Sequence, residues 1–348
     1  MQGWPFISVI VPVLNRERDI GRCLESLLAL DYPSFEIIVV ENGSTDQTPE
    51  VISRYPVRMV IERKRGAYIA RNTGVEMAQG EIIAFTDSDC VVEKDWLKAL
   101  AGNYIDQRVG GVGGHLLPFK ASTMVEQFLS FGILAIFHSP RKGPVRSDPH
   151  RFLSGALGSA NMSYRSCVLK ELGGFDPNLA FFGGDYDLCW RVQRAGYAVI
   201  YDPEAIVYHR LRNSLSSMIT QFFYFGKYLP LLLKRQPGYS SYITIKTYLF
   251  SPWEFRCELP VRMLITLDFS TVSLLAIIVA TMYPPLFYLS IPMLGLMVLG
   301  TWRSSTRIAR RTNQMRWLFL FPLLHLVRSY AFTVGKIVGG IRFRVVAL

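Results

Sequence analysis

Two acidic residues that follow an apolar run could carry chemistry. Residues 82–89 read Ile-Ile-Ala-Phe-Thr-Asp-Ser-Asp, so a buried strand is expected to end directly before Asp87 and Asp89. In open α/β folds, ligands bind at the edge where the strands end. Two carboxylates at that edge can hold a divalent cation, and the cation can hold a diphosphate. A solvated acidic loop is the alternative, and these two residues alone do not exclude it.

Three other polar residues occupy positions suited to a site. Glu41 follows an apolar run, where an acid can hydrogen-bond a base or a ribose. Asp185 opens a segment with helical spacing; there it can accept a proton from a ligand or simply cap the helix. His209 follows a short apolar run and could complete a metal site with the two aspartates, although a lone histidine is usually structural.

The elements that would position these residues alternate along the first 210 residues or so. Continuous apolar runs separated by helical patterns predict a mostly parallel sheet with helices on both faces. The expected strands are 7–11, 35–40, 58–61 and 82–85, and the expected helices are 19–30, 48–54 and 67–78.

The composition indicates the kind of partner. The net charge is +11 and half of the residues are hydrophobic, which favours an anionic membrane lipid over nucleic acid. The five cysteines are scattered, which indicates free thiols in a reducing compartment. The first apolar stretch is short and contains Pro12, so it predicts a strand and not a signal peptide.

Two later apolar runs predict a membrane hairpin. Residues 264–283 and 286–302 have about the length needed to cross a bilayer, and a Pro-Pro turn joins them. Arginines lie on both outer flanks, which places these flanks in the cytosol.

Two more segments suit a membrane surface. Residues 216–235 mix aromatic and basic side chains, as in an interfacial helix or, equally, a packed surface helix. The run at 317–348 contains Arg328 at the end of its most apolar part. Because a charge at mid-bilayer costs about 2.5–3.5 kcal/mol, we favour an interfacial helix over a third span.

Taken in order, the motifs resemble those of the family 2 glycosyltransferases, which have the GT-A fold. The resemblance runs from about Ile7 to His209, and the membrane tail resembles the subgroup that builds surface polysaccharides and glycolipids. The matching segments are 11–15, 41–46, 70–74, 87–89, 159–162, 173–175, 185–188 and His209.

The resemblance implies roles for the donor-side residues. Asp87 and Asp89 would hold the ribose and Mg²⁺ or Mn²⁺ on the diphosphate, with Asp89 the better metal ligand and His209 an additional one. Glu41 would contact the base, and Arg71 would lie near the nucleotide. The residues expected at the nucleotide sugar are Pro12, Leu14, Glu41, Arg71, Asp87, Ser88 and Asp89.

On the acceptor side, the resemblance implies that Asp185 is the general base. Gly184, Asp187 and Arg191 would lie beside it.

Three positions depart from the family pattern. Glu41 replaces an aspartate, Leu14 stands where many members have a tyrosine that stacks on the base, and Gly184 replaces the glutamate before the catalytic base. The segment after Asp187 lacks Gln-x-x-Arg-Trp, the signature of processive synthases.

The expected function is inverting transfer of a sugar from a nucleoside-diphosphate sugar to a hydroxyl of a lipid-linked or polysaccharide acceptor. The alternative is a polyprenyl-phosphate glycosyl synthase, whose phosphate acceptor needs no base; the family-type base at Asp185 favours the hydroxyl. A degenerate binding or scaffold protein is disfavoured because Asp87, Asp89, Asp185 and His209 are all retained.

The expected organisation has four parts in a multi-pass protein of the plasma membrane with a cytoplasmic catalytic domain. These parts are a GT-A domain at 1–212, connecting interfacial helices at 213–262, the hairpin at 263–303, and a basic loop with a final helix at 304–348.

Overall fold

The computed structural model describes residues 3–131, 144–146, 157–179, 182–235, 241–245, 253–257, 263–267 and 284–347. Contacts within the chain divide it into two units. The first comprises Met1–Ser122 and Gly132–Leu211, and the second comprises Thr123–Phe131 and Arg212–Leu348.

The first unit is built on one mixed sheet with the order β3-β2-β1-β4-β8-β6-β9-β5, in which β7 also pairs with β9. The first four strands of this order run parallel, whereas β8 runs antiparallel to both of its neighbours. The strands are β1 (Ile7–Val13), β2 (Phe35–Glu41), β3 (Arg58–Ile61), β4 (Ile82–Phe85), β5 (Cys90–Val92), β6 (Val109–Pro118), β7 (Val145–Arg146), β8 (Met162–Arg165) and β9 (Ala198–His209).

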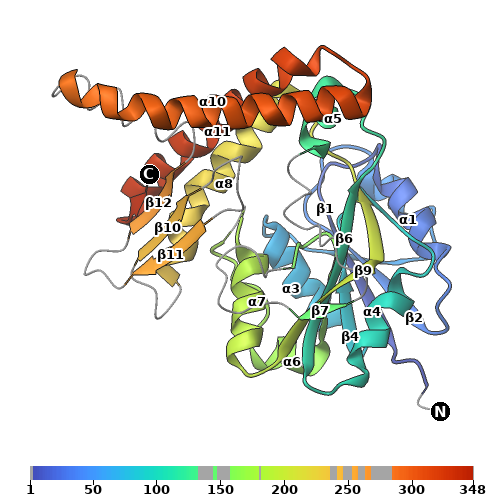
Figure 1. Ribbon diagram of the computed structural model, residues 1–348. Coiled ribbons are helices and arrows are strands. Elements are labelled where there is room, and N and C mark those ends of the chain that lie inside the picture. Colours follow the sequence, from blue (N-terminus) through green and yellow to red (C-terminus); the bar gives the residue numbers. More distant parts are fainter. Residues whose placement is uncertain are drawn as a thin grey trace. The chain divides into compact units, whose positions relative to one another are not determined.

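Helices lie on both sides of this sheet, with α1 and α4 on one side and α3 and α7 on the other (Figure 1). The predicted α/β class is therefore confirmed. The helices are α1 (Ile20–Leu28), α2 (Thr48–Ile52), α3 (Ala67–Met77), α4 (Trp96–Gly102), α6 (Ser166–Glu171) and α7 (Gly184–Arg194), with a short 3₁₀ turn at Asn103–Ile105.

The central strands explain where a site can form. β1 and β4 are almost completely buried because helices cover both of their faces, and this selects continuous apolar runs. The register pairs Val13 of β1 with Glu41 of β2, and Ile10 of β1 with Phe85 of β4. Because these strands are parallel, the residues that follow them emerge along one edge of the sheet.

The second unit combines helices with a small four-stranded sheet of order β11-β10-β12-β13. Its elements are α5 (Met124–Ser130), α8 (Leu215–Arg235), β10 (Ser241–Ile245), β11 (Trp253–Cys257), β12 (Met263–Leu267), α10 (Pro284–Thr312), α11 (Trp317–Phe343) and β13 (Val346–Ala347). α8 and α11 cross closely, since a Cβ on Gly226 would lie only 2.0 Å from the carbonyl oxygen of Phe332.

The predicted hairpin is not shown. Residues 264–267, which open the first expected span, lie in β12, and residues 268–283 lie outside the described residues. The second expected span, 286–302, is helical but belongs to the longer α10. The connecting segment, expected to be helical, contains β10 and β11 after α8. A short apolar run is compatible with either a strand or a helix. At residues 264–267, pairing with β10 makes the run a strand.

The last helix, which we expected to lie in the membrane interface, has the length and composition of a possible span. Within the described residues, α11 is the one helix that is long and apolar enough to cross a bilayer. The guanidinium of Arg328 lies 5.5 Å from the ring of Phe128 and 5.4 Å from that of Phe222. Two aromatic rings therefore lie against the half-buried Arg328, the charge that made us favour an interfacial helix. Multi-pass topology is not supported.

Candidate active site

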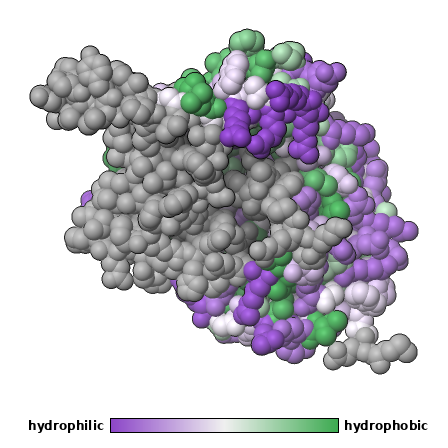
Figure 2. Space-filling view, in the orientation of Figure 1, coloured by the Kyte–Doolittle hydropathy of each residue, from purple (hydrophilic) through white to green (hydrophobic). Residues whose placement is uncertain are grey.

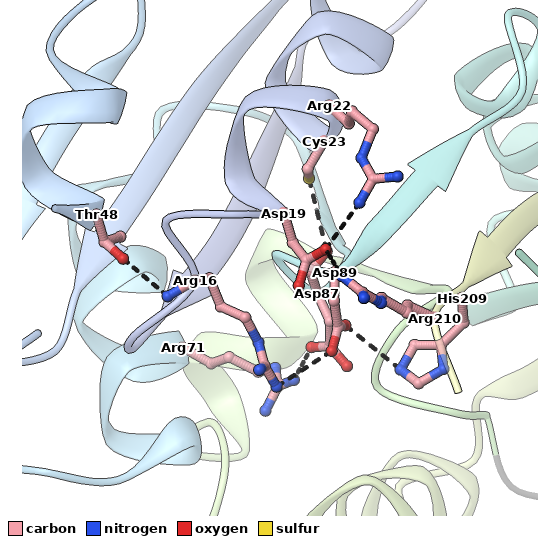
Figure 3. Close-up of polar contacts among 10 residues, drawn as sticks. All are labelled: Arg16, Asp19, Arg22, Cys23, Thr48, Arg71, Asp87, Asp89, His209 and Arg210. Carbon is pink, nitrogen blue, oxygen red and sulfur yellow. Dashed lines mark hydrogen bonds and ion pairs between the residues drawn. The ribbon is translucent and has the colours of Figure 1, made fainter. Parts of the chain in front are cut away.

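The two aspartates of the predicted site are each paired with an arginine (Figure 3). Arg71 Nη2 lies 2.5 Å from Asp87 Oδ1, and Arg16 Nη2 lies 3.2 Å from Asp89 Oδ2. His209 Nε2 lies 3.4 Å from the other oxygen of Asp89. We call these five residues the carboxylate cluster.

Strand pairing brings the distant members of the cluster together. Cys90 of β5 is the register partner of His209 at the end of β9, so the histidine lies beside Asp89. Arg71 projects from α3 and is almost fully buried, while Arg16 follows β1. The sequence analysis identified four of the five members but did not single out Arg16, which carries no signal beyond its place after the first strand.

Further cations surround the cluster. Asp19, just before α1, accepts hydrogen bonds from Arg22 Nη2 at 2.8 Å and from Arg210 Nη1 at 2.5 Å. The backbone N–H of Arg210 also donates to the Asp89 carbonyl at 3.1 Å. This basic surrounding suits an anionic ligand such as a diphosphate.

The chemistry of the cluster fits a divalent cation with an anionic ligand. One ligand atom from each of Asp89, Cys90 and His209 lies within 4.8 Å of the other two. Burial and the neighbouring aspartates raise the pKa of the Cys90 thiol well above its ordinary value, so the carboxylate and imidazole are the natural donors. Arg71 Nε is buried and has no hydrogen-bond partner among the described residues. Its N–H is therefore a donor available to a phosphate oxygen.

Asp185 is held in the first turn of α7. Its oxygens accept the backbone N–H of Ser159 at 3.2 Å and that of Tyr186 at 3.0 Å. Burial raises the pKa of its carboxyl to about 6, although the charge of Arg71 and the two N–H donors lower it. The cap position belongs to Gly183, so Asp185 lies within the first turn of α7 and is not its N-cap residue. A carboxyl with a pKa close to neutrality is suited to exchange a proton.

Tyr68 is a site residue that the sequence analysis missed. Its hydroxyl oxygen accepts the N–H of Gly184 at 3.1 Å, and the Arg71 guanidinium lies 5.4 Å from its ring centre. A Cβ on Gly184 would lie 2.6 Å from that ring. The tyrosine therefore explains the glycine that precedes Asp185. The available signal was its position one helical turn before Arg71.

Other predicted residues are placed as follows. Leu14 is 38% exposed after β1, whereas Glu41 and Ser88 are buried and Pro12 is half-buried. The Glu41 carboxylate accepts the N–H of Ser44, which fixes the loop after β2. Their donor contacts stay predictions.

Asp187 and Arg191 form hydrogen bonds with each other, and Arg191 also bonds to backbone carbonyls. Arg191 Nε donates to Asp187 Oδ2 at 2.8 Å, and its other nitrogens donate to the carbonyls of Leu172 and Gly174. These contacts fasten α7 to the preceding turn. An acceptor-side role for the pair stays a prediction.

The segment 159–162 has a structural part. Asn161 Nδ2 donates to the carbonyls of His115 and Ala205, and its Oδ1 accepts from the indole of Trp96. The side chain thus joins β6, β9 and α4 beneath Ser159, which contacts Asp185.

Comparisons with known proteins agree with this arrangement. The family model for Glycosyl transferase family 2 matches residues 8–156. Glycosyltransferase AglE of Haloferax volcanii is 31% identical over 220 residues, which are 60% of this chain and 68% of that protein. The pre-mycofactocin glycosyltransferase of Mycobacterium tuberculosis is 28% identical over 256 residues, which are 71% of this chain and 52% of that protein. This chain therefore spans about half the length of the mycobacterial relative.

A solved structure has a similar fold. A mannosyltransferase from Pyrobaculum calidifontis, in complex with GDP-Man and Mn²⁺, superposes with a TM-score of 0.55 at 17% identity, covering 98% of this chain and 87% of that one. This likeness concerns the fold, which is GT-A-like. The family model and the Haloferax relative, of which this chain covers more than two thirds, lead to one conclusion: the chain belongs to glycosyl transferase family 2 and is a glycosyltransferase.

Proposed function

We propose that this glycosyltransferase is metal-dependent and inverting, and that it transfers a sugar to a hydroxyl with Asp185 as the general base. The observation that carries the proposal is the buried Asp185 carboxyl, whose pKa is raised to about 6. Arg71 connects it to the carboxylate cluster, because its guanidinium pairs with Asp87 while its charge also lowers the pKa of Asp185.

The carboxylate cluster would hold the donor. Asp89 and His209 would bind Mn²⁺ or Mg²⁺, and Arg71 would direct its unpaired Nε–H toward the diphosphate. When bound, the divalent cation would neutralise the negative charge that builds up on the leaving diphosphate. Mn²⁺ is the natural ion to test first, because the Pyrobaculum mannosyltransferase is a complex with GDP-Man and Mn²⁺.

Asp185 would act on the acceptor. Its ionised carboxylate takes the proton from the acceptor hydroxyl as that oxygen bonds to the anomeric carbon. The bond from the anomeric carbon to the diphosphate breaks, and its electron pair leaves with the nucleoside diphosphate. Because attack and departure occur on opposite faces of the carbon, the product has the inverted configuration.

The alternative is transfer to a polyprenyl phosphate, which is already ionised and needs no base. Burial raises the pKa of the Asp185 carboxyl, and keeping a carboxylate buried lowers the stability of the protein. A phosphate acceptor would make this base unnecessary. The environment of Asp185 therefore favours the hydroxyl.

We also propose that the second unit attaches the enzyme to the cytosolic face of the plasma membrane. Residues 212–348 carry 16 Lys and Arg but 3 Asp and Glu, whereas the preceding residues carry 22 and 24. Phe319 and Ile341 of α11 are 73% and 77% exposed. Hydrophobic and strongly hydrophilic residues also lie side by side around α10 and α11 (Figure 2). Basic and apolar groups together suit anionic lipid.

The test is the release of nucleoside diphosphate from a panel of sugar nucleotides with Mn²⁺, with and without extracted membrane lipids. We expect lipid-dependent release from one donor, and its loss in Asp185→Asn. Asp95→Asn, which changes an exposed carboxylate in the same way, is the matched control. Release that persists in Asp185→Asn and follows added polyprenyl phosphate would establish the alternative instead.

A further inference from the structure

Arg16 contacts the carboxylate to which we assign the metal. Its Nη2 lies 3.2 Å from Asp89 Oδ2, and His209 Nε2 lies 3.4 Å from Asp89 Oδ1. A divalent cation on Asp89 would use these same oxygens. We infer that Arg16 is a built-in counter-ion of Asp89, which leaves the carboxylate when the cation binds and then pairs with the diphosphate. This inference rests on the proposed metal role of Asp89.

The backbone beneath Arg16 is fixed, so the exchange needs only the side chain. Its N–H donates to Thr48 Oγ1 at 2.8 Å, and its carbonyl accepts the N–H groups of Asp19 and Ile20 at 2.9 and 3.0 Å. The preceding Asn15 has a φ of 52° and accepts the N–H of Thr45 through its side chain. A long side chain on a fixed backbone can exchange one ion-pair partner for another by rotamer changes alone.

Burial permits this movement. The Arg16 side chain is 31% exposed, whereas that of Asp89 is 11% exposed. Arg71, the other arginine of the cluster, is almost fully buried and holds Asp87. Arg16 is therefore the member with room to leave, while Arg71 keeps its place.

Charge gives the exchange a direction. A cation on Asp89 repels the nearby guanidinium, since two like charges at contact distance are unfavourable. The displaced Arg16 then adds positive charge near the cation, and a diphosphate neutralises both. Cation alone should therefore bind weakly, and cation with diphosphate should bind well. By linkage, each ligand strengthens the binding of the other.

The experiment measures two affinities with opposite expected changes. Binding of Mn²⁺ alone to the full chain in detergent is followed by the electron paramagnetic resonance signal of free Mn²⁺. Binding of the preformed Mn²⁺ complexes of UDP and GDP is followed by calorimetry. In Arg16→Gln, Mn²⁺ alone should bind about five-fold more tightly, and the metal–nucleotide complex should bind several-fold more weakly. A variant that simply loses its fold would bind both more weakly.

Two further variants control for charge. Arg16→Lys keeps the cation and should remain within about two-fold of wild type for Mn²⁺ alone. Arg18→Gln removes the same charge from an exposed arginine of the same loop, which has no ion-pair partner in the described part of the chain, and should also change little. If Mn²⁺ alone binds Arg16→Gln no more tightly than wild type, the inference is overturned.

Asp89→Asn separates this inference from the proposal on which it rests. Mn²⁺ affinity that is unchanged in Asp89→Asn would remove the metal assignment itself. Affinity that is lost in Asp89→Asn but unchanged in Arg16→Gln would remove only the counter-ion.

Discussion

The N–H of Gly184 donates to the hydroxyl oxygen of Tyr68 at 3.1 Å, and this contact leaves no space for a side chain on the glycine. Tyr68 also stacks on Phe175, with ring centres 5.4 Å apart. The ring therefore lies between the turn at 173–175 and the start of α7. It fixes the backbone from which Asp185 projects.

Gly184→Ala should destabilise the first unit and reduce transfer. The new Cβ would lie 2.6 Å from the Tyr68 ring, and overpacking of this kind typically costs about 1–3 kcal/mol. The measurement is thermal unfolding together with turnover. Gly102→Ala is the control, because a Cβ there meets no atom within 4 Å. If the ring is the cause, the effects of Gly184→Ala and Tyr68→Ala should not add, and additive effects would contradict this account.

Turnover should fall as the pH decreases through about 6. Asp185 acts as a base only when ionised, and its pKa is raised to about 6 by burial. The measurement is the pH profile of kcat/KM with saturating Mn²⁺, compared with the profile of donor binding over the same range. An acid limit near pH 4 would mean that the group observed is an ordinary exposed carboxylate.

Removal of the Asp185 charge should stabilise the protein at alkaline pH. The pKa of Asp185 in the folded state lies above the ordinary value of 3.8. Its contribution to the free energy of unfolding is therefore fully present below pH 3.8 and is lost as the pH rises through 6. The difference in the free energy of unfolding between Asp185→Asn and wild type should change in favour of the variant by up to about 3 kcal/mol from pH 4 to pH 8. Unfolding at both pH values measures this gain, and an equal difference at the two would contradict it.

Arg71→Gln should weaken binding of the nucleotide-sugar donor and raise the pKa of Asp185. Loss of the guanidinium removes a charge-assisted contact to the diphosphate, for which about a ten-fold loss of affinity is expected. The charge of Arg71 also lowers the pKa of Asp185, so the variant should move the acid limit of turnover to higher pH. Nucleotide binding and the pH profile are measured together. A shift to lower pH would show that Arg71 does not act on this carboxyl.

The sequence by itself determined the elements of the first unit as far as β4 and four of the five residues of the carboxylate cluster. Continuous apolar runs can be buried on both faces only in a central sheet, so β1, β2 and β4 were readable, as were the acids that follow them. In the second unit, the helical segments expected at 216–235, 286–302 and 317–348 are helical in the structure, but its strands were not predicted. An apolar run carries no period that separates a buried strand from a helix, and residues 264–267 form β12 through pairing with β10.

Only the tertiary structure decided which side chains meet. Arg16 and Tyr68 lie 73 and 117 residues from the partners that give them a role, Asp89 and Asp185, and no local pattern marks such distances. The pKa of Asp185 is likewise a property of its surroundings, because burial sets it and a sequence does not state burial residue by residue. Arg328 shows the same principle, since the rings of Phe128 and Phe222 that its guanidinium contacts come from two other helices.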